Sequence, residues 1–315
     1  MAPICLIEAL PSGGWRVNDS ALCILKNVQQ PVQVIAIFGP KGTGKSFLMN
    51  KIAETQQGFR LSLPGGPCTE GIWMLCFPHP SLKEHHLVLL DIEGFDTEKG
   101  DKRKEIKLFI LAVLLSNVFI YNTQGGVTQE ELQKLIYVKE LPHLVKAASD
   151  EETNTCLLAS LLPHFIWCSR DTILDLNMGE EILTPEDYLN DVLNARQGAE
   201  SSVCWINKLF LQPRLYDICE PCPTARFVNL DSLPEDQLAF LFKKQVQTLK
   251  EYIFNKGTKT ITGGEKATGQ MLACLVESLT SSLSEGDVVP LDKVFERVAW
   301  KEVCCYCCCY WISLE

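Results

Sequence analysis

PVQVIAIFGPKGTGKS, residues 31–46, contains the strongest structural signal in the chain. Its first half, Pro31–Phe38, is a β-branched run that predicts a strand buried on both faces. Its second half matches G-x-x-x-x-G-K-[ST], and residues 45–53 continue with apolar side chains at helical spacing. A buried strand, a glycine-rich turn and a helix in this order are typical of a phosphate-binding loop.

The residue types in this loop suit phosphate chemistry. Glycines let the backbone turn tightly, so that successive N–H groups point at phosphate oxygens, and the helix that begins at Lys45 adds its positive dipole end. Lys45 is expected to reach the β- and γ-phosphates, and Ser46 to bind Mg²⁺. The alternative is a glycine-rich turn without a ligand. The predicted nucleotide-binding residues of the loop are Gly39, Pro40, Lys41, Gly42, Thr43, Gly44, Lys45, Ser46 and Phe47.

A second motif, Asp91-Ile92-Glu93-Gly94, directly follows the apolar run LVLL. An acid at the end of a strand beside a phosphate loop can hold Mg²⁺ through water, and the amide of Gly94 can meet a γ-phosphate. Between the two motifs, Thr69 ends a Gly/Pro-rich segment, residues 58–68, that predicts a long loop. A threonine hydroxyl delivered by such a loop is a candidate Mg²⁺ ligand that senses the γ-phosphate. An ordinary loop threonine remains the alternative.

Strand and helix signals alternate along the first half of the chain. This alternation predicts βαβ units, and therefore an α/β fold with a mostly parallel sheet. Further strands are expected at residues 72–77, 87–90, 118–121 and 165–168. Helices are expected at residues 105–116, 130–145, 185–193, 233–254, 268–283 and from 290 to 303.

Composition restricts the class of protein. The 315 residues are 46% hydrophobic and 22% charged, which is ordinary for a globular chain. The net charge of −10 argues against non-specific binding of nucleic acid, which needs surplus Lys and Arg. The longest apolar run, residues 108–121, is too short to cross a bilayer, so no transmembrane segment is expected. The N-terminus lacks a basic region followed by an apolar one, so we expect no signal peptide and an intracellular location.

Recognition of the base is predicted at Asp171. Guanine presents an N1–H and an exocyclic amine, and one aspartate can accept both hydrogen bonds, whereas adenine offers no such pair. The pattern N-K-x-D begins at Asn207-Lys208 but lacks its acid. Arg170-Asp171, which follows a short apolar strand, is the better candidate. A surface ion pair between these two residues is the alternative.

Several motifs together resemble the guanylate-binding proteins, interferon-inducible large GTPases of the dynamin superfamily. The resemblance runs from about residue 5 to about residue 303, and it implies a P-loop GTPase-type domain of three layers, a mostly parallel central sheet flanked by helices. It also implies a GTPase domain at residues 1–285, the start of a helical domain at 286–303 and a cysteine-rich tail unlike the family at 304–315. The motifs are LIEA, QPVQVIAIFGPKGTGKSFLMNKIA, CTEGIWMLCFPHP, LVLLDIEGFDTEKGD, LAVLLSNVFIYN, FIWCSRDTILDL, LTPEDYL and EYIFNKGTKTITGG.

The resemblance also implies a function. GTP becomes the expected substrate and Mg²⁺ the cofactor, with Arg170 and Asp171 in the guanine-reading motif T-[LV]-R-D. Thr69 becomes the expected switch-loop ligand of Mg²⁺, beside Ser46 and Asp91. Members of the family pair head to head when nucleotide is bound, so a dimer with a second copy or a relative is expected. The family further implies a cytoplasmic location, association with vesicles through partners, and innate defence against intracellular pathogens.

Two departures from the family pattern concern hydrolysis. The family carries an arginine just before Thr43 that acts as an arginine finger, a device worth about 10³ to 10⁵ in rate. Here that position is Gly42, and Lys41, one residue earlier, can substitute only as a point charge. The switch-loop serine of the family is Pro67. Glu93, the acid of the network around the attacking water, is retained, so Lys45, Glu93, Thr69 and Lys41 are the candidate catalytic residues.

Three alternatives remain open at this point. The first is a catalytically weak module that works by GTP-dependent dimerisation and modulates full-length relatives, and the second is a P-loop ATPase. The third concerns the tail, CCYCCCYWISLE, whose cysteines suit palmitoylation or belong to an alternative terminus without a folded role. The last four residues contain no cysteine, so they are not expected to form a prenylation box.

Overall fold

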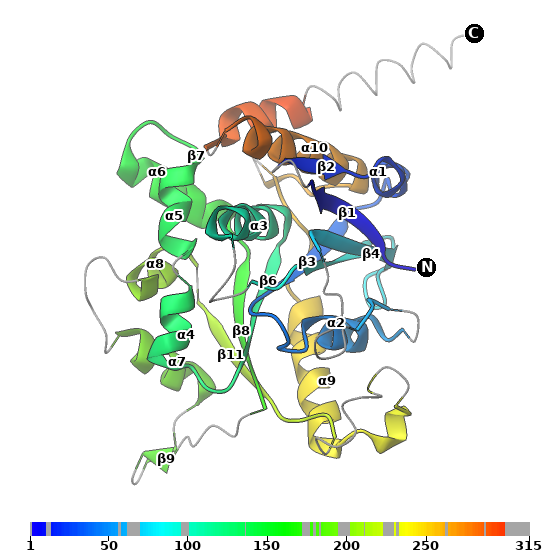
Figure 1. The fold of residues 1–315 in the computed structure, drawn as a ribbon, viewed down its shortest axis with the longest axis vertical. Helices are drawn as coiled ribbons and strands as arrows, with labels where there is room; N and C mark the ends of the chain where they lie inside the picture. Colours follow the sequence, from blue (N-terminus) through cyan, green and yellow to red (C-terminus); the bar gives the residue numbers. More distant parts are fainter. Residues whose placement is uncertain are drawn as a thin grey trace.

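The structure, a computed structural model, is built around one sheet whose strands run in the order β11-β8-β6-β3-β5-β4-β1-β2 (Figure 1). The described residues are 2–10, 14–55, 58–61, 70–95, 101–135, 137–171, 177–178, 181–182, 184–194, 202–210, 212–222, 230, 233–261, 264–286 and 288–299.

The centre of the sheet is parallel. β3 (Val32–Phe38) pairs in parallel with β5 and with β6, and β8 and β11 extend the parallel part beyond β6. On the other side β4 pairs antiparallel with β5, and β1 and β2 continue antiparallel. The prediction of an α/β fold with a mostly parallel sheet is therefore confirmed. The remaining strands of the sheet are β1 (Ile4–Ala9), β2 (Trp15–Val17), β4 (Ile72–Pro78), β5 (His86–Ile92), β6 (Val118–Gln124), β8 (His164–Arg170) and β11 (Arg214–Ile218).

Helices cover both faces of this sheet and make three layers (Figure 1). Alternate side chains of β3 belong to two separate apolar clusters, because successive residues of a strand point to opposite faces. α2 (Lys45–Ala53) and α9 (Phe240–Phe254) pack on the face of Ile35 and Ile37. The other face carries α1 (Asp19–Lys26), α3 (Lys102–Leu115), α5 (Tyr137–Leu144), α7 (Pro185–Asn194), α8 (Ser202–Leu209) and α10 (Gly269–Glu285).

Two predicted helices differ from the structure. The helix expected at 130–145 is divided into α4 (Gln129–Lys134) and α5, and the buried Leu135 closes the first of them. The helix expected at 233–254 begins only at Phe240, after the short 3₁₀ helix η2 (Glu235–Gln237). Leu238 separates the two with extended backbone, which directs its buried side chain into the cluster beneath α2 and α9.

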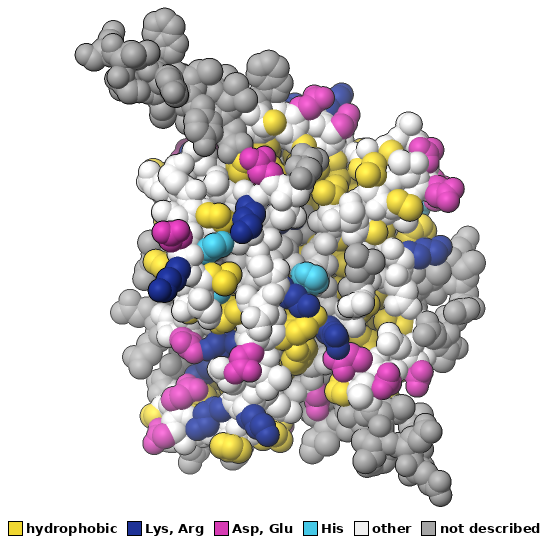
Figure 2. Space-filling model, turned by 180° about the vertical axis from the view of Figure 1, so that it is seen from behind, with side chains coloured by type: hydrophobic (Ala, Val, Ile, Leu, Met, Phe, Trp, Pro, Cys, Tyr) yellow, Lys and Arg dark blue, Asp and Glu magenta, His cyan; other side chains and the backbone are white. Residues whose placement is uncertain are grey.

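The remaining elements lie around the periphery of the sheet. α6 runs from Glu151 to Leu161, and residues 291–299 form a helix within the stretch predicted as 290–303. Two short strand pairs are β7 (Val145–Lys146) with β12 (Val289–Pro290), and β9 (Asn177–Met178) with β10 (Glu181–Ile182). Among the described residues, no helix has both the length and the apolar character that a bilayer crossing requires. On the face seen in Figure 2, basic and acidic side chains are interspersed.

A buried polar network joins β3, β4 and α9. The Nε2 atom of His79 lies 2.8 Å from Oε1 of Gln33, whose amide donates to the carbonyl oxygen of Ile253 at 2.9 Å. Backbone N–H groups of Ser81 and Leu82 both donate to Nδ1 of the ring. Because Nδ1 accepts two hydrogen bonds, the ring proton must lie on Nε2, and a second proton on Nδ1 would oppose both donors. Burial, helped by nearby His85, lowers the pKa of His79 to about 4.

This network predicts a loss of stability in mild acid. The unfolded histidine binds its proton near pH 6.5, whereas the folded one resists it until about pH 4, so stability falls as pH decreases between these values. We expect His79 to account for about 1–2 kcal/mol of the loss between pH 7 and pH 5. Denaturant unfolding at several pH values gives the free energy of unfolding of wild type and of His79→Gln. This free energy should depend less on pH in the variant than in the wild type. His143→Gln, at an exposed histidine of α5, should keep the wild-type dependence. Equal pH dependence of all three proteins would contradict this role of His79.

Candidate functional site

The glycine-rich loop joins the carboxyl end of β3 to the first turn of α2, as predicted. Gly39, Gly42 and Gly44 have φ angles of 151°, 77° and 79°, in the region that favours glycine. A side chain at Gly39 is excluded for a further reason, because its Cβ would lie 2.1 Å from the carbonyl oxygen of Asn122. Ligands of parallel α/β sheets bind at this carboxyl edge.

The loop is fixed to the neighbouring strand through Thr43. The side-chain amide of Asn122, on β6, donates to the carbonyl oxygen of Thr43 at 2.8 Å and to its hydroxyl oxygen at 2.9 Å. The Thr43 hydroxyl in turn lies 3.0 Å from the carbonyl oxygen of Pro40 and 3.3 Å from that of Asn122. Both side chains are buried, so these bonds hold the loop in one shape before any ligand binds.

Lys45, Ser46 and Asp91 meet at the start of α2. Lys45 is 8% exposed, and its ammonium donates to the carbonyl oxygen of Pro40 at 2.8 Å, across the loop. The hydroxyl of Ser46 donates to Oδ2 of Asp91 at 2.6 Å, and Asp91 is 1% exposed at the end of β5. A hydroxyl and a carboxylate side by side are the hard oxygen donors that Mg²⁺ takes, so these residues fit the predicted metal.

Glu93 is held in place by two elements. Its carboxylate accepts a hydrogen bond from the backbone N–H of Gly71 at 2.9 Å and an ion pair from Lys104, on α3, at 2.7 Å. Gly71 follows shortly after the predicted loop ligand Thr69. Thr69 itself lies outside the described residues, as does Pro67. Glu93 therefore anchors Gly71, the residue directly before β4.

Gly94 and Lys41 define the side of the loop that faces the second motif. A Cβ at Gly94 would lie 2.7 Å from the Lys45 ammonium and 2.8 Å from Cα of Lys41, so only glycine allows this close approach. The backbone N–H of Lys41 donates to the carbonyl oxygen of Phe95 at 3.0 Å. The side chain of Lys41 and the residue Gly42 are exposed.

Arg170 is the last residue of β8, beside the phosphate loop, and Asp171 directly follows the strand. Arg170 is 3% exposed, and its guanidinium donates to the carbonyl oxygen of Gly44 at 3.4 Å and lies 6.0 Å above the ring of Phe242, on α9. Phe242 stacks on Phe47 at 5.8 Å, so Phe47 is part of the core between α2 and α9. Asp171 has a φ of 58°, and its N–H donates to the carbonyl oxygen of Ile218 at 3.0 Å.

Two buried polar atoms of this pair have no hydrogen-bond partner among the described residues. They are Oδ1 of Asp171 and Nε of Arg170. An unsatisfied buried polar atom is costly and calls for a ligand or an ordered water. Beneath them, burial raises the pKa of Cys168 to about 12, so its thiol stays neutral. The surface-pair alternative for Arg170 and Asp171 is wrong, because Arg170 is buried.

The structure thus brings the phosphate loop, Asp91, Gly94, Arg170 and Asp171 to one edge of the sheet. Sequence reasoning missed Asn122, Lys104 and Phe242, which support Thr43, Glu93 and Arg170. Asn122 ends one of the quoted family motifs, but nothing in its local sequence indicates its contact with Thr43. Asn122 and Phe242 lie far along the chain from the residues that they support, whereas Lys104 lies close to Glu93. Among the described residues, no three or more His, Cys, Asp or Glu are grouped so as to hold a metal ion by themselves.

Comparison with known proteins identifies similar chains. A model of the guanylate-binding protein N-terminal domain matches residues 13–262. The chain is 39% identical over 311 residues to guanylate-binding protein 3 of Homo sapiens, which covers 94% of this chain and 52% of that protein. It is 38% identical over 313 residues to human guanylate-binding protein 1, with the same coverage of both chains. The chain spans about half the length of the curated relatives it matches.

Proposed function

The chain belongs to the guanylate-binding protein family, and we propose that it binds GTP with Mg²⁺ at the phosphate loop and hydrolyses it to GDP and phosphate. The observation that carries this proposal is the pair of buried, unsatisfied atoms on Asp171 and Arg170, directly beside the loop. A guanine base would satisfy the Asp171 carboxylate with its N1–H and its exocyclic amine.

Each residue of the site has a proposed role in binding. Backbone N–H groups of residues 41–46 would surround the phosphates, and the Lys45 ammonium would exchange the Pro40 carbonyl for β- and γ-phosphate oxygens. Ser46 and Asp91 would hold Mg²⁺, and Thr69 would be a further ligand from the segment next to Gly71, which Glu93 anchors. The metal supplies positive charge that neutralises the charge developing on the phosphate oxygens.

Hydrolysis follows as an in-line displacement. A water attacks the γ-phosphorus while the bond to the β–γ bridging oxygen breaks, and the water's proton leaves with the phosphate or to solvent. Lys45 and the loop amides stabilise the leaving GDP oxygens. Glu93, which is paired with Lys104, would act by positioning the segment that orders the attacking water. The exposed Lys41 is a candidate source of extra positive charge.

The test of this proposal is single-turnover hydrolysis with excess protein and Mg²⁺, alongside a titration of GTP on the same sample. Binding with formation of GDP supports an enzyme. Absence of GTP binding in a folded sample would contradict the proposal. Following GMP in the same assay determines whether a second phosphate is removed.

A second candidate function is supported by Gly42: a GTP-binding module with weak catalysis that acts by pairing with relatives. The position that carries the family's arginine finger has no side chain here. A Cβ at Gly42 would meet no atom of the described residues within 4 Å, so these leave open space for a longer residue. The φ of 77° would strain such a residue by about 1 kcal/mol, which the fold can tolerate.

Gly42→Arg should therefore raise the turnover of GTP by at least about tenfold, because the guanidinium neutralises charge on the transferred phosphoryl group. Single-turnover rates of wild type, Gly42→Arg and Gly42→Ala separate the effect of the added charge from that of backbone strain. Alanine introduces the strain without the charge. No gain with arginine, in a variant that still binds GTP, would count against the missing arginine as the cause of slow hydrolysis.

The organisation of the chain and its partners complete the proposal. Residues 1–285 form the GTPase domain, 286–303 begin the helical domain, and 304–315 form a separate tail. Nucleotide-bound domains pair head to head, either with a second copy or with a related guanylate-binding protein. The protein acts in the cytoplasm, reaches vesicles through these partners, and serves interferon-induced innate defence. These assignments are supported by membership of the family.

A further inference from the structure

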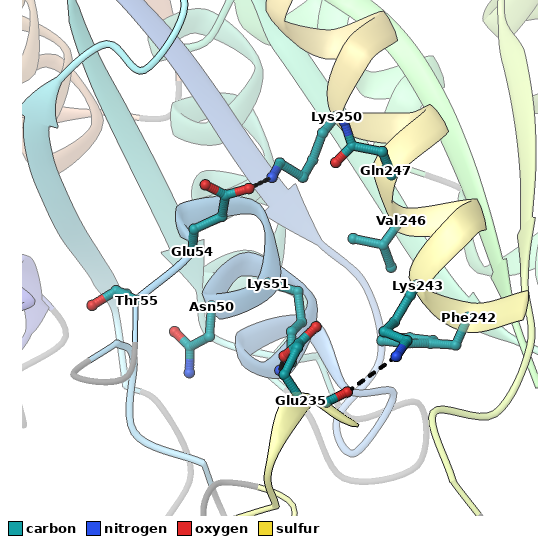
Figure 3. Close-up of a pocket in the computed structure, with 10 residues that line it drawn as sticks. All are labelled: Asn50, Lys51, Glu54, Thr55, Glu235, Phe242, Lys243, Val246, Gln247 and Lys250. Carbon is teal, nitrogen blue, oxygen red and sulfur yellow. Dashed lines mark hydrogen bonds and ion pairs between the residues drawn. The ribbon is translucent and has the colours of Figure 1, made fainter. Parts of the chain in front are cut away.

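A pocket of about 540 Å³ lies between the C-terminal half of α2 and the side of α9, beyond the glycine-rich loop itself (Figure 3). Its volume is in the range that holds small ligands. The residues that line it are Asn50, Lys51, Glu54, Thr55, Glu235, Phe242, Lys243, Val246, Gln247 and Lys250.

In the ion pairs of this pocket, the lysine side chains are more buried than their glutamate partners. The side chain of Lys250 is 8% exposed, whereas that of its ion-pair partner Glu54 is 68% exposed. Lys51 is 21% exposed, and its partner Glu235 is 65% exposed. The lysines therefore belong to the wall of the pocket, and the glutamates reach them from its rim. Exposed carboxylates contribute little to such pairs and are easily displaced.

The three lysines have unused hydrogen-bonding capacity. An ammonium has three donors. Among the described residues, Lys250 donates to Glu54, and Lys243 donates to the backbone carbonyl oxygen of Glu235 at 3.3 Å (Figure 3). Lys51 donates to the carboxylate of Glu235 at 2.6 Å. The described residues of the pocket thus present three positive charges against two exposed negative ones, in a protein whose net charge is −10.

We propose that this pocket binds a small soluble molecule that carries at least two phosphate-type negative charges. Such an anion accepts hydrogen bonds from several ammonium groups at once, and these charge-assisted bonds exceed the exposed ion pairs that they replace. Phe242 and Val246 form an apolar part of the wall that suits the carbon part of the molecule. The site is separate from the phosphate loop and does not depend on the proposed GTPase activity.

The test uses pyrophosphate as the probe, measured by calorimetry without divalent cations. All variants are made in the full chain carrying Lys45→Ala, so that the phosphate loop contributes little to the signal. Glu54→Gln and Lys250→Gln remove the same ion pair, so any structural cost of losing it is shared. Their effects on binding should be opposite. Glu54→Gln should tighten binding about threefold or more by removing a competitor, and Lys250→Gln should weaken it about tenfold.

Three results would overturn the site. The first is loss of all pyrophosphate binding in Lys45→Ala, which would leave the phosphate loop as the anion site. The second is a change of pyrophosphate affinity in the same direction in both variants. The third is an unchanged affinity in both variants. None of these results bears on GTP binding, which is measured separately on the unmodified chain, so the two proposals fail independently.

Discussion

Lys45→Ala should raise the dissociation constant for GTP at least about 100-fold. The buried ammonium already donates to the Pro40 carbonyl oxygen across the loop, and in the complex it would form charge-assisted bonds to two phosphates. Each such bond contributes about 1.5–3 kcal/mol, and its removal also leaves phosphate charge unneutralised. Calorimetric titration of GTP with Mg²⁺ measures the effect directly.

The matched control is Lys26→Ala, which removes a lysine from α1 that pairs with Glu277 at the surface. This variant should bind GTP as the wild type does. Because Lys45 is buried, thermal unfolding of Lys45→Ala must first show that the fold is retained. A folded Lys45→Ala protein with unchanged affinity for GTP would exclude the glycine-rich loop as the triphosphate site.

Asp171→Asn should abolish the preference for guanine and create one for xanthine. The carboxylate of Asp171 offers two acceptors to the N1–H and the exocyclic amine of guanine. An asparagine side chain offers one acceptor and one donor, which match the N1–H and the 2-carbonyl of xanthine. Because a mismatch leaves buried polar atoms unpaired, we expect the ratio of GTP to XTP affinity to fall at least about 100-fold.

Competition of GTP, XTP and ATP against a labelled nucleotide, in wild type and variant, gives these ratios. Asp191→Asn, at an exposed aspartate of α7, is the control and should leave them unchanged. The same experiment decides the ATPase alternative. Comparable affinity of the wild type for ATP and GTP would contradict the assignment of Asp171, and so would a variant that still prefers GTP to XTP.

Local sequence was sufficient for the elements nearest the ligand. The strand predicted from residue 31 is β3, and the helix predicted at residues 45–53 has those bounds in α2. The strands before Asp91 and Arg170 were also identified, because each is a short apolar run with a polar residue at its end. The family resemblance, based on motifs along the whole globular part, was confirmed by the match to residues 13–262.

Prediction was weaker where side chains pack against distant parts of the chain. The break at Leu238 between η2 and α9 has no local signal, because the burial of this side chain against α2 decides it. The N-terminal β1, β2 and α1 were not predicted, although they extend the sheet and cover its face. A weakly patterned segment of this kind gains most of its stability from tertiary packing.

The chain's own order of residues predicted a phosphate loop and an acid at the end of a later strand of an α/β sheet. The Arg-Asp pair kept a surface ion pair as its alternative until the family resemblance favoured base recognition. Periodicity and turn chemistry operate over a few residues, so they can be read along the chain. Only the folded structure placed Asn122 on Thr43, Phe242 beneath Arg170 and the lysines of α9 opposite α2. Such contacts depend on how strands and helices pack across the sheet, and residues so far apart in sequence share no local pattern that predicts them.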